Sequence, residues 1–253
     1  MTAVARAGLS LVKGLRHETL DEVELGASGP VGDRRFCLVD PEQRAVLRTV
    51  RHPELVQVRA RRVGVALALD LPGGTVADTP AATGELVECD YWGRSPELEL
   101  LRYPPAAMLG ELTGRSVALA AVRRTGDVVY GAPVTVVTTT ELDRLAARAG
   151  WPGLVEDSAR FRATLTVDDR DQPWPQDPTG GRLRVGEAEV RINGPIPRCR
   201  VVDAHPSTGR MDRHLLAALA GYRRAAGAVH FGWYAEVLVP GRVHPGDDVC
   251  WRA

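Results

Sequence analysis

The sequence has few of the residues that mark several large protein classes. Its four cysteines (Cys37, Cys89, Cys199 and Cys250) are far apart and form no CxxC pair. This spacing argues against a zinc ribbon and against a cysteine ligand set for an iron–sulfur cluster. Basic and acidic side chains number 32 each. A balanced charge argues against nonspecific nucleic-acid binding, which needs a net basic face.

Several signatures are also missing. No apolar run approaches the roughly 20 residues of a membrane-spanning helix, so we expect no membrane partner. The amino-terminal segment MTAVARAGLSLVKGL shows no clear signal-peptide core. We therefore expect a cytoplasmic protein without disulfides. The motifs GxSxG, GxxxxGK[ST] and helix-opening GxGxxG are absent, which argues against a serine hydrolase, a P-loop protein and a dinucleotide-binding fold.

The patterns that are present predict a mainly β fold with a few short helices. The 253 residues allow one large domain or two small ones, and 26 glycines and 18 prolines indicate many turns. Hairpin-like spacing in the first half predicts a small barrel or curled sheet, and a second unit begins near Asp127. Expected strands include residues 4–12, 55–58, 63–71, 134–137, 182–185, 188–192 and 230–239. Expected helices cover residues 106–112, 141–149 and 212–222.

One stretch, NGPIPRCRVVDAHPSTG at residues 193–209, carries a cysteine between two arginines. Fixed positive charge from Arg198 and Arg200 favours the thiolate form of Cys199. A thiolate acts as a nucleophile, a redox group or a soft metal ligand. The alternative is a small buried side chain within a strand, because free cysteine is among the most buried residue types.

Basic residues stand at the ends of several predicted strands. They are Lys13, Arg34, Arg35, Arg162, Arg198 and Arg200, and they would suit a phosphorylated ligand if they converged on one pocket. The alternative for each is a solvated or salt-bridged side chain.

Threonines follow the strand at residues 134–137. Thr139 or Thr140 is expected as the N-cap of the next helix. The same helix start could instead hold a phosphate group.

Four segments together resemble MOSC-domain proteins, and the resemblance covers nearly the whole chain. They read VGDRRFCLVD, FRATLTVDD, GPIPRC followed by PSTG, and FGWYAEVLVPGRVHPGDDV. The first half resembles the family's N-terminal β-barrel domain. The resemblance implies a β-barrel-like domain at residues 1–120, packed on a β-barrel MOSC domain at residues 121–253.

The resemblance also implies a bound molybdenum cofactor, a molybdopterin, with Cys199 as the molybdenum ligand and catalytic residue. The cofactor-binding residues that it implies are Lys13, Arg34, Thr139, Thr140, Arg162, Thr164 and Arg198. A family-level association with pyridoxal phosphate binding comes with it. Two positions depart from the family pattern: Gly14 replaces a serine of the opening motif, and Thr164 replaces an asparagine of the FRPN motif.

The resemblance includes the amidoxime-reducing component. It implies a molybdenum-dependent oxidoreductase that reduces N-hydroxylated small molecules. Electrons would come from a separate ferredoxin, flavin reductase or cytochrome. The first alternative is a sulfur-transfer or cofactor-carrier protein that uses a Cys199 persulfide. The second is a scaffold that has kept the fold, lost the cofactor and binds another phosphorylated ligand.

Overall fold

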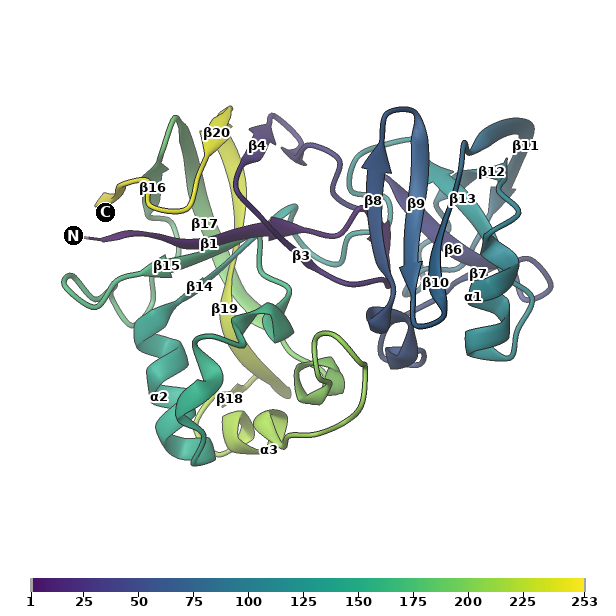
Figure 1. The fold of residues 1–253 in the computed structure, drawn as a ribbon. Helices are drawn as coiled ribbons and strands as arrows, with labels where there is room; N and C mark the ends of the chain where they lie inside the picture. Colours follow the sequence, from purple (N-terminus) through teal and green to yellow (C-terminus); the bar gives the residue numbers. More distant parts are fainter. Residues whose placement is uncertain (1, 253) are drawn as a thin grey trace.

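The computed structural model describes residues 2–252 and has two β-rich lobes (Figure 1). A nine-stranded sheet in the order β21-β16-β17-β19-β14-β15-β1-β3, with β18 beside β19, forms the C-terminal lobe. Its strands are β1 (Ala3–Leu9), β3 (Glu18–Leu20), β14 (Val134–Thr138), β15 (Leu165–Asp168), β16 (Arg182–Val185), β17 (Ala188–Pro197), β18 (Arg224–Ala225), β19 (Ala228–Val239) and β21 (Val249–Arg252).

The N-terminal lobe contains a six-stranded sheet and a three-stranded sheet. The six strands are β2 (Val12–Lys13), β6 (Phe36–Asp40), β7 (Ala45–Val46), β11 (Ala81–Glu88), β12 (Glu97–Arg102) and β13 (Ala118–Val122). The three-stranded sheet contains β8 (Arg59–Val63), β9 (Ala66–Leu71) and β10 (Gly74–Asp78). Together the two lobes confirm the prediction of a mainly β fold with few helices.

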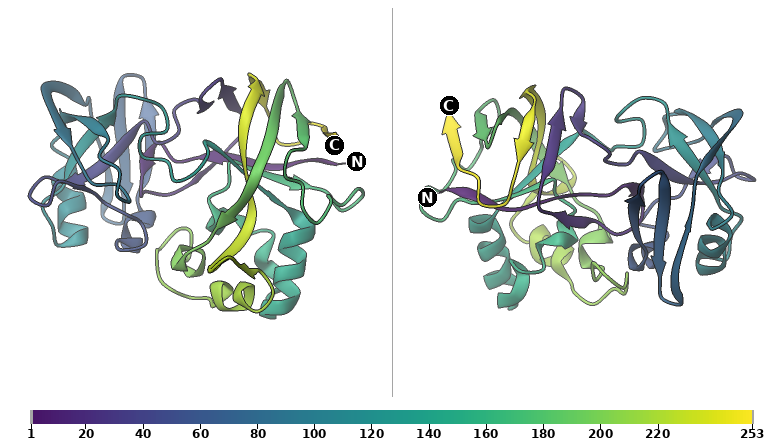
Figure 2. Two further views of the ribbon diagram at one scale, coloured as in Figure 1. Left: turned by 180° about the vertical axis from the view of Figure 1, so that it is seen from behind. Right: turned by 45° about the horizontal axis from the view of Figure 1, so that its top comes forward.

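The first strands of the chain cross between the lobes. β1 lies between β15 and β3 in the large sheet. A further small sheet joins β4 (Val23–Gly26) and β5 (Gly29–Pro30) to β20 (Gly241–Val243) near the other end of the chain. Figure 2 shows the purple amino-terminal strands running among the green and yellow ones. A domain boundary at residue 120 therefore places β1, β3 and β4 in the first domain. However, β1 and β3 belong to the large sheet of the C-terminal lobe, and β4 pairs with β20.

Three α-helices and four short 3-10 segments complete the described chain. They are α1 (Ala106–Thr113), α2 (Thr139–Ala149), α3 (Leu215–Ala220), η1 (Pro53–Gln57), η2 (Pro152–Leu154), η3 (Ser158–Phe161) and η4 (Arg200–Asp203). α2 connects the parallel strands β14 and β15, and it lies beside α3 below the large sheet (Figure 1). The N-cap of α2 is Thr138, which accepts from the backbone N–H of Glu141 at 3.4 Å. The expected cap at Thr139 or Thr140 is wrong because the helix begins at Thr139, two residues before the expected start at Glu141.

Three further expectations need correction. Residues 55–58 belong mostly to a 3-10 helix, which begins with Pro53 and whose last carbonyls accept from the Arg16 guanidinium. Residues 63–71 are divided between β8 and β9 by a turn at Gly64, where φ is +60°. The helix expected from residue 212 begins only at Leu215, because the Asp212 carboxylate is held outside it by Arg160.

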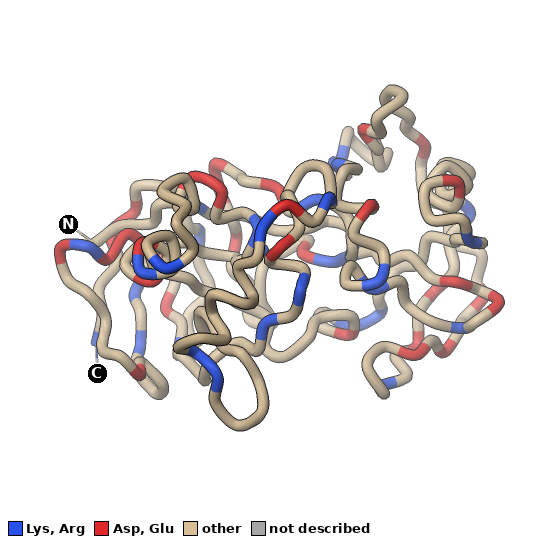
Figure 3. Tube along the Cα trace, turned by 90° about the horizontal axis from the view of Figure 1, so that it is seen from below, with Lys and Arg blue, Asp and Glu red and all other residues tan. Residues whose placement is uncertain are grey.

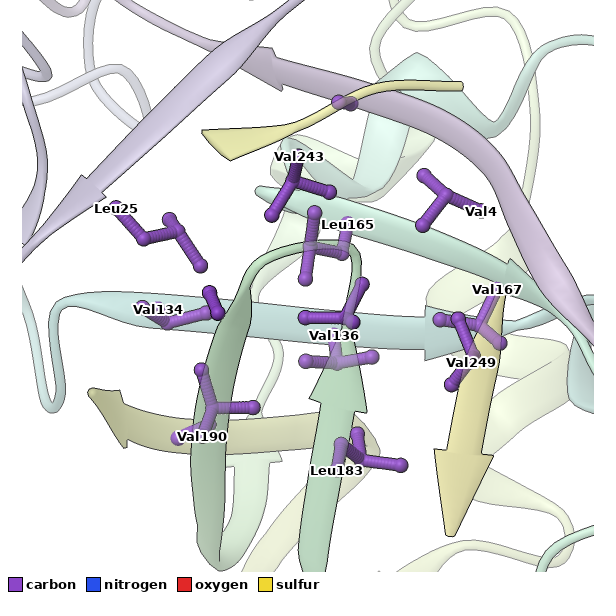
Figure 4. Packing of buried hydrophobic residues seen from close by; sticks show 14 of the residues in the cluster. Val4, Leu25, Val134, Val136, Leu165, Val167, Leu183, Val190, Val243 and Val249 are labelled. Atoms are coloured by element: carbon purple, nitrogen blue, oxygen red, sulfur yellow. The ribbon is translucent and has the colours of Figure 1, made fainter. Parts of the chain in front are cut away.

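The core of the C-terminal lobe is built from aliphatic side chains of strands far apart in sequence. Leu25 of β4, Val134 of β14 and Leu165 of β15 are each 0% exposed and belong to one cluster (Figure 4). Burial of these aliphatic side chains stabilises the fold by roughly 25 cal/mol per Å² of apolar surface.

Charged residues of both signs are interspersed along the described chain (Figure 3), in agreement with the balanced composition.

The structure predicts that Leu25→Ala destabilises the C-terminal lobe, although Leu25 lies in the first tenth of the chain. The expected loss is about 2–5 kcal/mol, because the side chain is fully buried. Urea unfolding followed by tryptophan fluorescence measures it, since Trp174, Trp233 and Trp251 surround this core. Val239→Ala, at 49% exposure, is the control and should change the free energy of unfolding by less than about 0.5 kcal/mol. Equal effects for the two variants would contradict the pairing of β4 with the C-terminal lobe.

Candidate functional site

A cavity of about 340 Å³ lies between the two lobes and includes Cys199. Its volume is in the range of small-molecule sites. The N-terminal lobe and the first strands contribute Lys13, Arg34, Arg48, Thr49, Val50, Tyr91 and Trp92. The other wall contains Tyr130, Thr135, Arg160, Phe161, Arg162, Ile196, Pro197, Arg198, Cys199, Val201, Val202 and Tyr234.

Cys199 is exposed in this cavity. It lies two residues after the end of β17 and directly before the 3-10 segment η4. The backbone of Cys199 itself is extended. The alternative of a small buried cysteine within a strand is therefore wrong. An exposed thiol at a strand end is accessible to a metal or an electrophile, which a core thiol is not.

Arg198 is fixed by backbone carbonyls instead of by a carboxylate. Its Nε donates to the carbonyl oxygen of Phe231 and its Nη1 to that of Phe161, each at 2.8 Å. Burial lowers the pKa of Arg198 to about 10. Its Nη2 is buried and has no hydrogen-bond partner among residues 2–252. An unpaired buried donor is costly, so this nitrogen is suited to an anionic ligand in the cavity.

Arg162 links the two lobes at the base of the same cavity. Its backbone is left-handed, with φ at +52°. Its Nη2 donates to Ser10 Oγ and to the carbonyl oxygen of Leu15, both at 2.8 Å. Burial, together with repulsion by Arg34, lowers the pKa of Arg162 to about 10. The guanidinium is thus held by neutral oxygens and keeps most of its charge for a ligand.

Arg34 and Lys13 bring two more cations to the cavity. The backbone N–H of Arg34 donates to the carbonyl oxygen of Ser10 at 2.6 Å, and its side chain pairs with Asp33. The Nζ of Lys13, the only lysine of the sequence, lies 5.5 Å from the centre of the Tyr91 ring. Burial, then repulsion by Arg34 and Arg162, lowers the pKa of Lys13 to about 7. The attraction of the Asp33 carboxylate offsets this lowering only in part.

The cavity carries a strong excess of positive charge. The described residues that line it include no aspartate or glutamate, whereas the basic ones are Lys13, Arg34, Arg48, Arg160, Arg162 and Arg198. Two of these side chains pair with carboxylates outside the lining. Arg160 makes two bonds to Asp212, at 2.7 and 2.9 Å, and Arg34 pairs with Asp33. A larger open hollow of about 1000 Å³ lies beside α1, but its Asp40 and Arg115 pair with each other. The cavity at Cys199 is the one suited to an anion.

The structure does not bring the three predicted threonines to the cavity lining. Thr139 Oγ1 donates to Asp168 at 2.8 Å, and the backbone N–H of Thr140 donates to Asp169 at 2.9 Å. Thr164 is buried and exchanges hydrogen bonds with Thr135, whose side chain does reach the lining. A cofactor-binding role for these threonines stays a prediction.

Gly14 explains one departure from the family pattern. It is buried next to Lys13 with φ at +96°, a conformation that a serine rarely adopts. The turn after Lys13 therefore depends on glycine in this chain.

Several lining residues were missed by the sequence reasoning. Arg48, Trp92 and Tyr130 lie in loops, and no motif distinguishes them from other loop residues. Tyr234 lies in the strand expected at residues 230–239, where alternation places it on the face opposite to Trp233. Arg200, which also flanks the cysteine, is exposed and does not line the cavity.

Comparison with known families gives the class of this protein. The MOSC N-terminal beta barrel domain matches residues 10–98, and the MOSC domain matches residues 117–250. The chain therefore belongs to the MOSC-domain family, a family related to the molybdenum cofactor.

Individual relatives are distant. A stretch of 78 residues is 35% identical to molybdenum cofactor sulfurase from Oryza sativa subsp. japonica, and the match covers 30% of this chain and 9% of that protein. YuaD protein from Bacillus subtilis is similar in structure, with a TM-score of 0.45 and 15% identity over 98% of this chain and 94% of the other. YiiM from Geobacillus stearothermophilus matches 48% of this chain and 54% of its own, with a TM-score of 0.34 and 16% identity.

Two kinds of feature are not found among residues 2–252. Residues 2–252 contain no group of three or more histidine, cysteine, aspartate or glutamate side chains arranged to hold a metal ion. Over the same residues, no helix has the length and apolar character needed to cross a membrane.

The structure predicts that Lys13 titrates near pH 7 when the cavity holds no anion. Its pKa in the folded chain lies below the ordinary 10.5. The unfolded chain therefore binds more protons between these values, and the free energy of unfolding rises with pH through this window. Because Lys13 is the only lysine, protein labelled with 15N-lysine gives one side-chain NMR signal, whose titration reports the pKa directly.

Arg162→Gln is the matched variant for this measurement. It removes one of the two cations that depress the pKa of Lys13, so the midpoint should move upward. Addition of inorganic phosphate to the wild-type protein should move it in the same direction. A titration midpoint of Lys13 near 10.5 in the wild-type protein would contradict the lowering of its pKa by burial and by repulsion from Arg34 and Arg162.

Proposed function

We propose that this protein is a molybdenum cofactor-dependent oxidoreductase that reduces N-hydroxylated small molecules, with molybdenum bound by Cys199. One observation carries the proposal: an exposed cysteine shares a cavity with six basic side chains and no carboxylate among its described lining residues. A soft thiolate ligand beside a cationic surface suits a metal held by an anionic cofactor.

The residues present fit such a cofactor. Cys199 supplies the one protein ligand that the metal needs in addition to the sulfur atoms of the cofactor. The unpaired Nη2 of Arg198 offers a buried donor, and Lys13, Arg34 and Arg162 offer charge to a phosphate group. Binding of an anion would also favour the protonated form of Lys13. These are the groups that we assign to holding the cofactor.

The reaction itself is a two-electron reduction. When bound, the cofactor supplies the redox couple, and the protein supplies binding, orientation and electrostatics. The N–O bond of the substrate breaks, two electrons and two protons are consumed, and the oxygen leaves as water. We assign the electrons to a separate donor protein of ferredoxin, flavin reductase or cytochrome type, in the cytoplasm. The basic lining disfavours cationic substrates.

A sulfur-transfer or cofactor-carrier role is the second candidate. The similarity to a protein named molybdenum cofactor sulfurase and the exposure of Cys199 favour it. In this case Cys199 would attack the outer sulfur of a partner's persulfide. A Cys199 persulfide forms, and the partner's cysteine leaves as a thiolate.

The proposal predicts that protein made in a host that synthesises the cofactor contains about one molybdenum atom per chain, because one thiolate ligand is available. Cys199→Ser should lose both the metal and the reduction of N-hydroxylated compounds. Metal analysis and turnover with a chemical reductant measure the two losses. Cys250→Ser is the control, because Cys250 lies on β21 outside the cavity lining.

The same preparations separate the two candidates. A labile mass increase of about 32 Da on Cys199, one sulfur atom, without molybdenum would support sulfur transfer. Tightly bound molybdenum, together with an unmodified mass of Cys199 after the metal has been removed, would support the reductase. Cofactor-loaded Cys199→Ser that keeps its metal would overturn the assignment of the ligand.

A further inference from the structure

Two large aromatic side chains stand exposed at the mouth of the cavity. Trp92 is 45% exposed and Tyr130 is 51% exposed, and both line the cavity that contains Cys199. Their ring centres are 5.5 Å apart and their planes are tilted by 58°. Partly exposed aromatic side chains at a ligand cavity offer surface for stacking with planar groups.

Trp92 is held at the mouth in an unfavourable backbone conformation. Its φ is +57°, which is a genuine outlier for a bulky residue. The turn around it is well fixed, since the backbone N–H of Gly93 donates to Asp90 Oδ1 at 3.0 Å and that of Tyr91 donates to the carbonyl oxygen of Arg94 at 2.8 Å. Strain of this kind persists where the surrounding structure enforces it, and it concentrates at ligand sites.

The segments that carry the two rings are tied to each other. Arg94 Nη2 donates to the carbonyl oxygen of Val129, the residue before Tyr130, at 2.6 Å. The guanidinium of Arg48 lies over the Trp92 ring, 4.6 Å from its centre. The rings are therefore anchored before a ligand arrives, which reduces the entropy lost on binding.

We propose that Trp92 and Tyr130 select substrates in which a planar aromatic ring is attached to the functional group that contains the N–O bond. The ring lies against the two aromatic side chains at the mouth, and the N–O group is directed into the cavity. The cation over Trp92 and the basic lining favour neutral or anionic rings over cationic ones. This inference rests on the proposed reductase function for the identity of the reacting group, but not for the binding of the ring.

Trp92→Asn tests the inference. Asparagine tolerates positive φ and carries no ring, so the turn is kept and the stacking surface is removed. Ligand-observed NMR with benzamide, a planar compound without an N–O bond, measures ring binding without turnover. The expected result is about tenfold weaker binding, which corresponds to about 1.4 kcal/mol. Leu86→Ala, 47% exposed and outside the lining, is the matched control and should bind benzamide as the wild type does.

Turnover of a matched pair of substrates provides the second measurement. The ratio of kcat/KM for benzamidoxime to that for acetamidoxime should fall about tenfold in Trp92→Asn. Unchanged benzamide binding, or an unchanged ratio, would overturn the inference. Loss of molybdenum from Trp92→Asn would also overturn it, because the ring would then belong to the cofactor site. Wild-type protein that binds benzamide through Trp92 but reduces neither amidoxime would overturn the reductase proposal and leave the aromatic selection in place.

Discussion

Positive charge that is buried without carboxylates is the constraint on which the site depends. Arg162 and Arg198 are held by carbonyl and hydroxyl oxygens, which fix the guanidinium groups without neutralising them. Neutral acceptors cost the protein stability relative to carboxylate partners, since desolvation of the charge is poorly offset. The lowered pKa values of these arginines and of Lys13 express this cost. An anionic ligand would supply the missing counter-charge.

The fold makes this arrangement possible because segments far apart in the sequence contribute to the surroundings of Arg162. Arg162 follows η3 in the C-terminal lobe, yet its acceptors are Ser10 and Leu15 from the chain's first turn. Arg34 in turn donates its backbone N–H to Ser10. The segment between β1 and β3 is thus a shared wall of the cavity. Any shift of one lobe against the other would therefore change the relative positions of Lys13, Arg34 and Arg162.

Local sequence patterns predicted the elements that depend on local physics. The helices at residues 106–112 and 141–149 are present, and each ends at a glycine with positive φ, Gly114 and Gly150. The pattern failed at residues 55–58, where a proline and the distant Arg16 decide the conformation. It also failed to place Arg48, Trp92 and Tyr130, because loops are positioned by long-range contacts such as the bond from Arg94 to Val129. The cysteine and the basic residues could be chosen from chemistry and resemblance, but their convergence required the structure.

The pairing of β1 with β15 and of β4 with β20 has a consequence for how the protein is made. The first 26 residues cannot complete their sheets until residues 165–168 and 241–243 have been synthesised. Contacts this distant in sequence form slowly, because a long loop must close before they are made. Until then β1 and β4 can pair only with their near neighbours β3 and β5. The two walls of the cavity come together only after Tyr234, which belongs to its lining, has been synthesised.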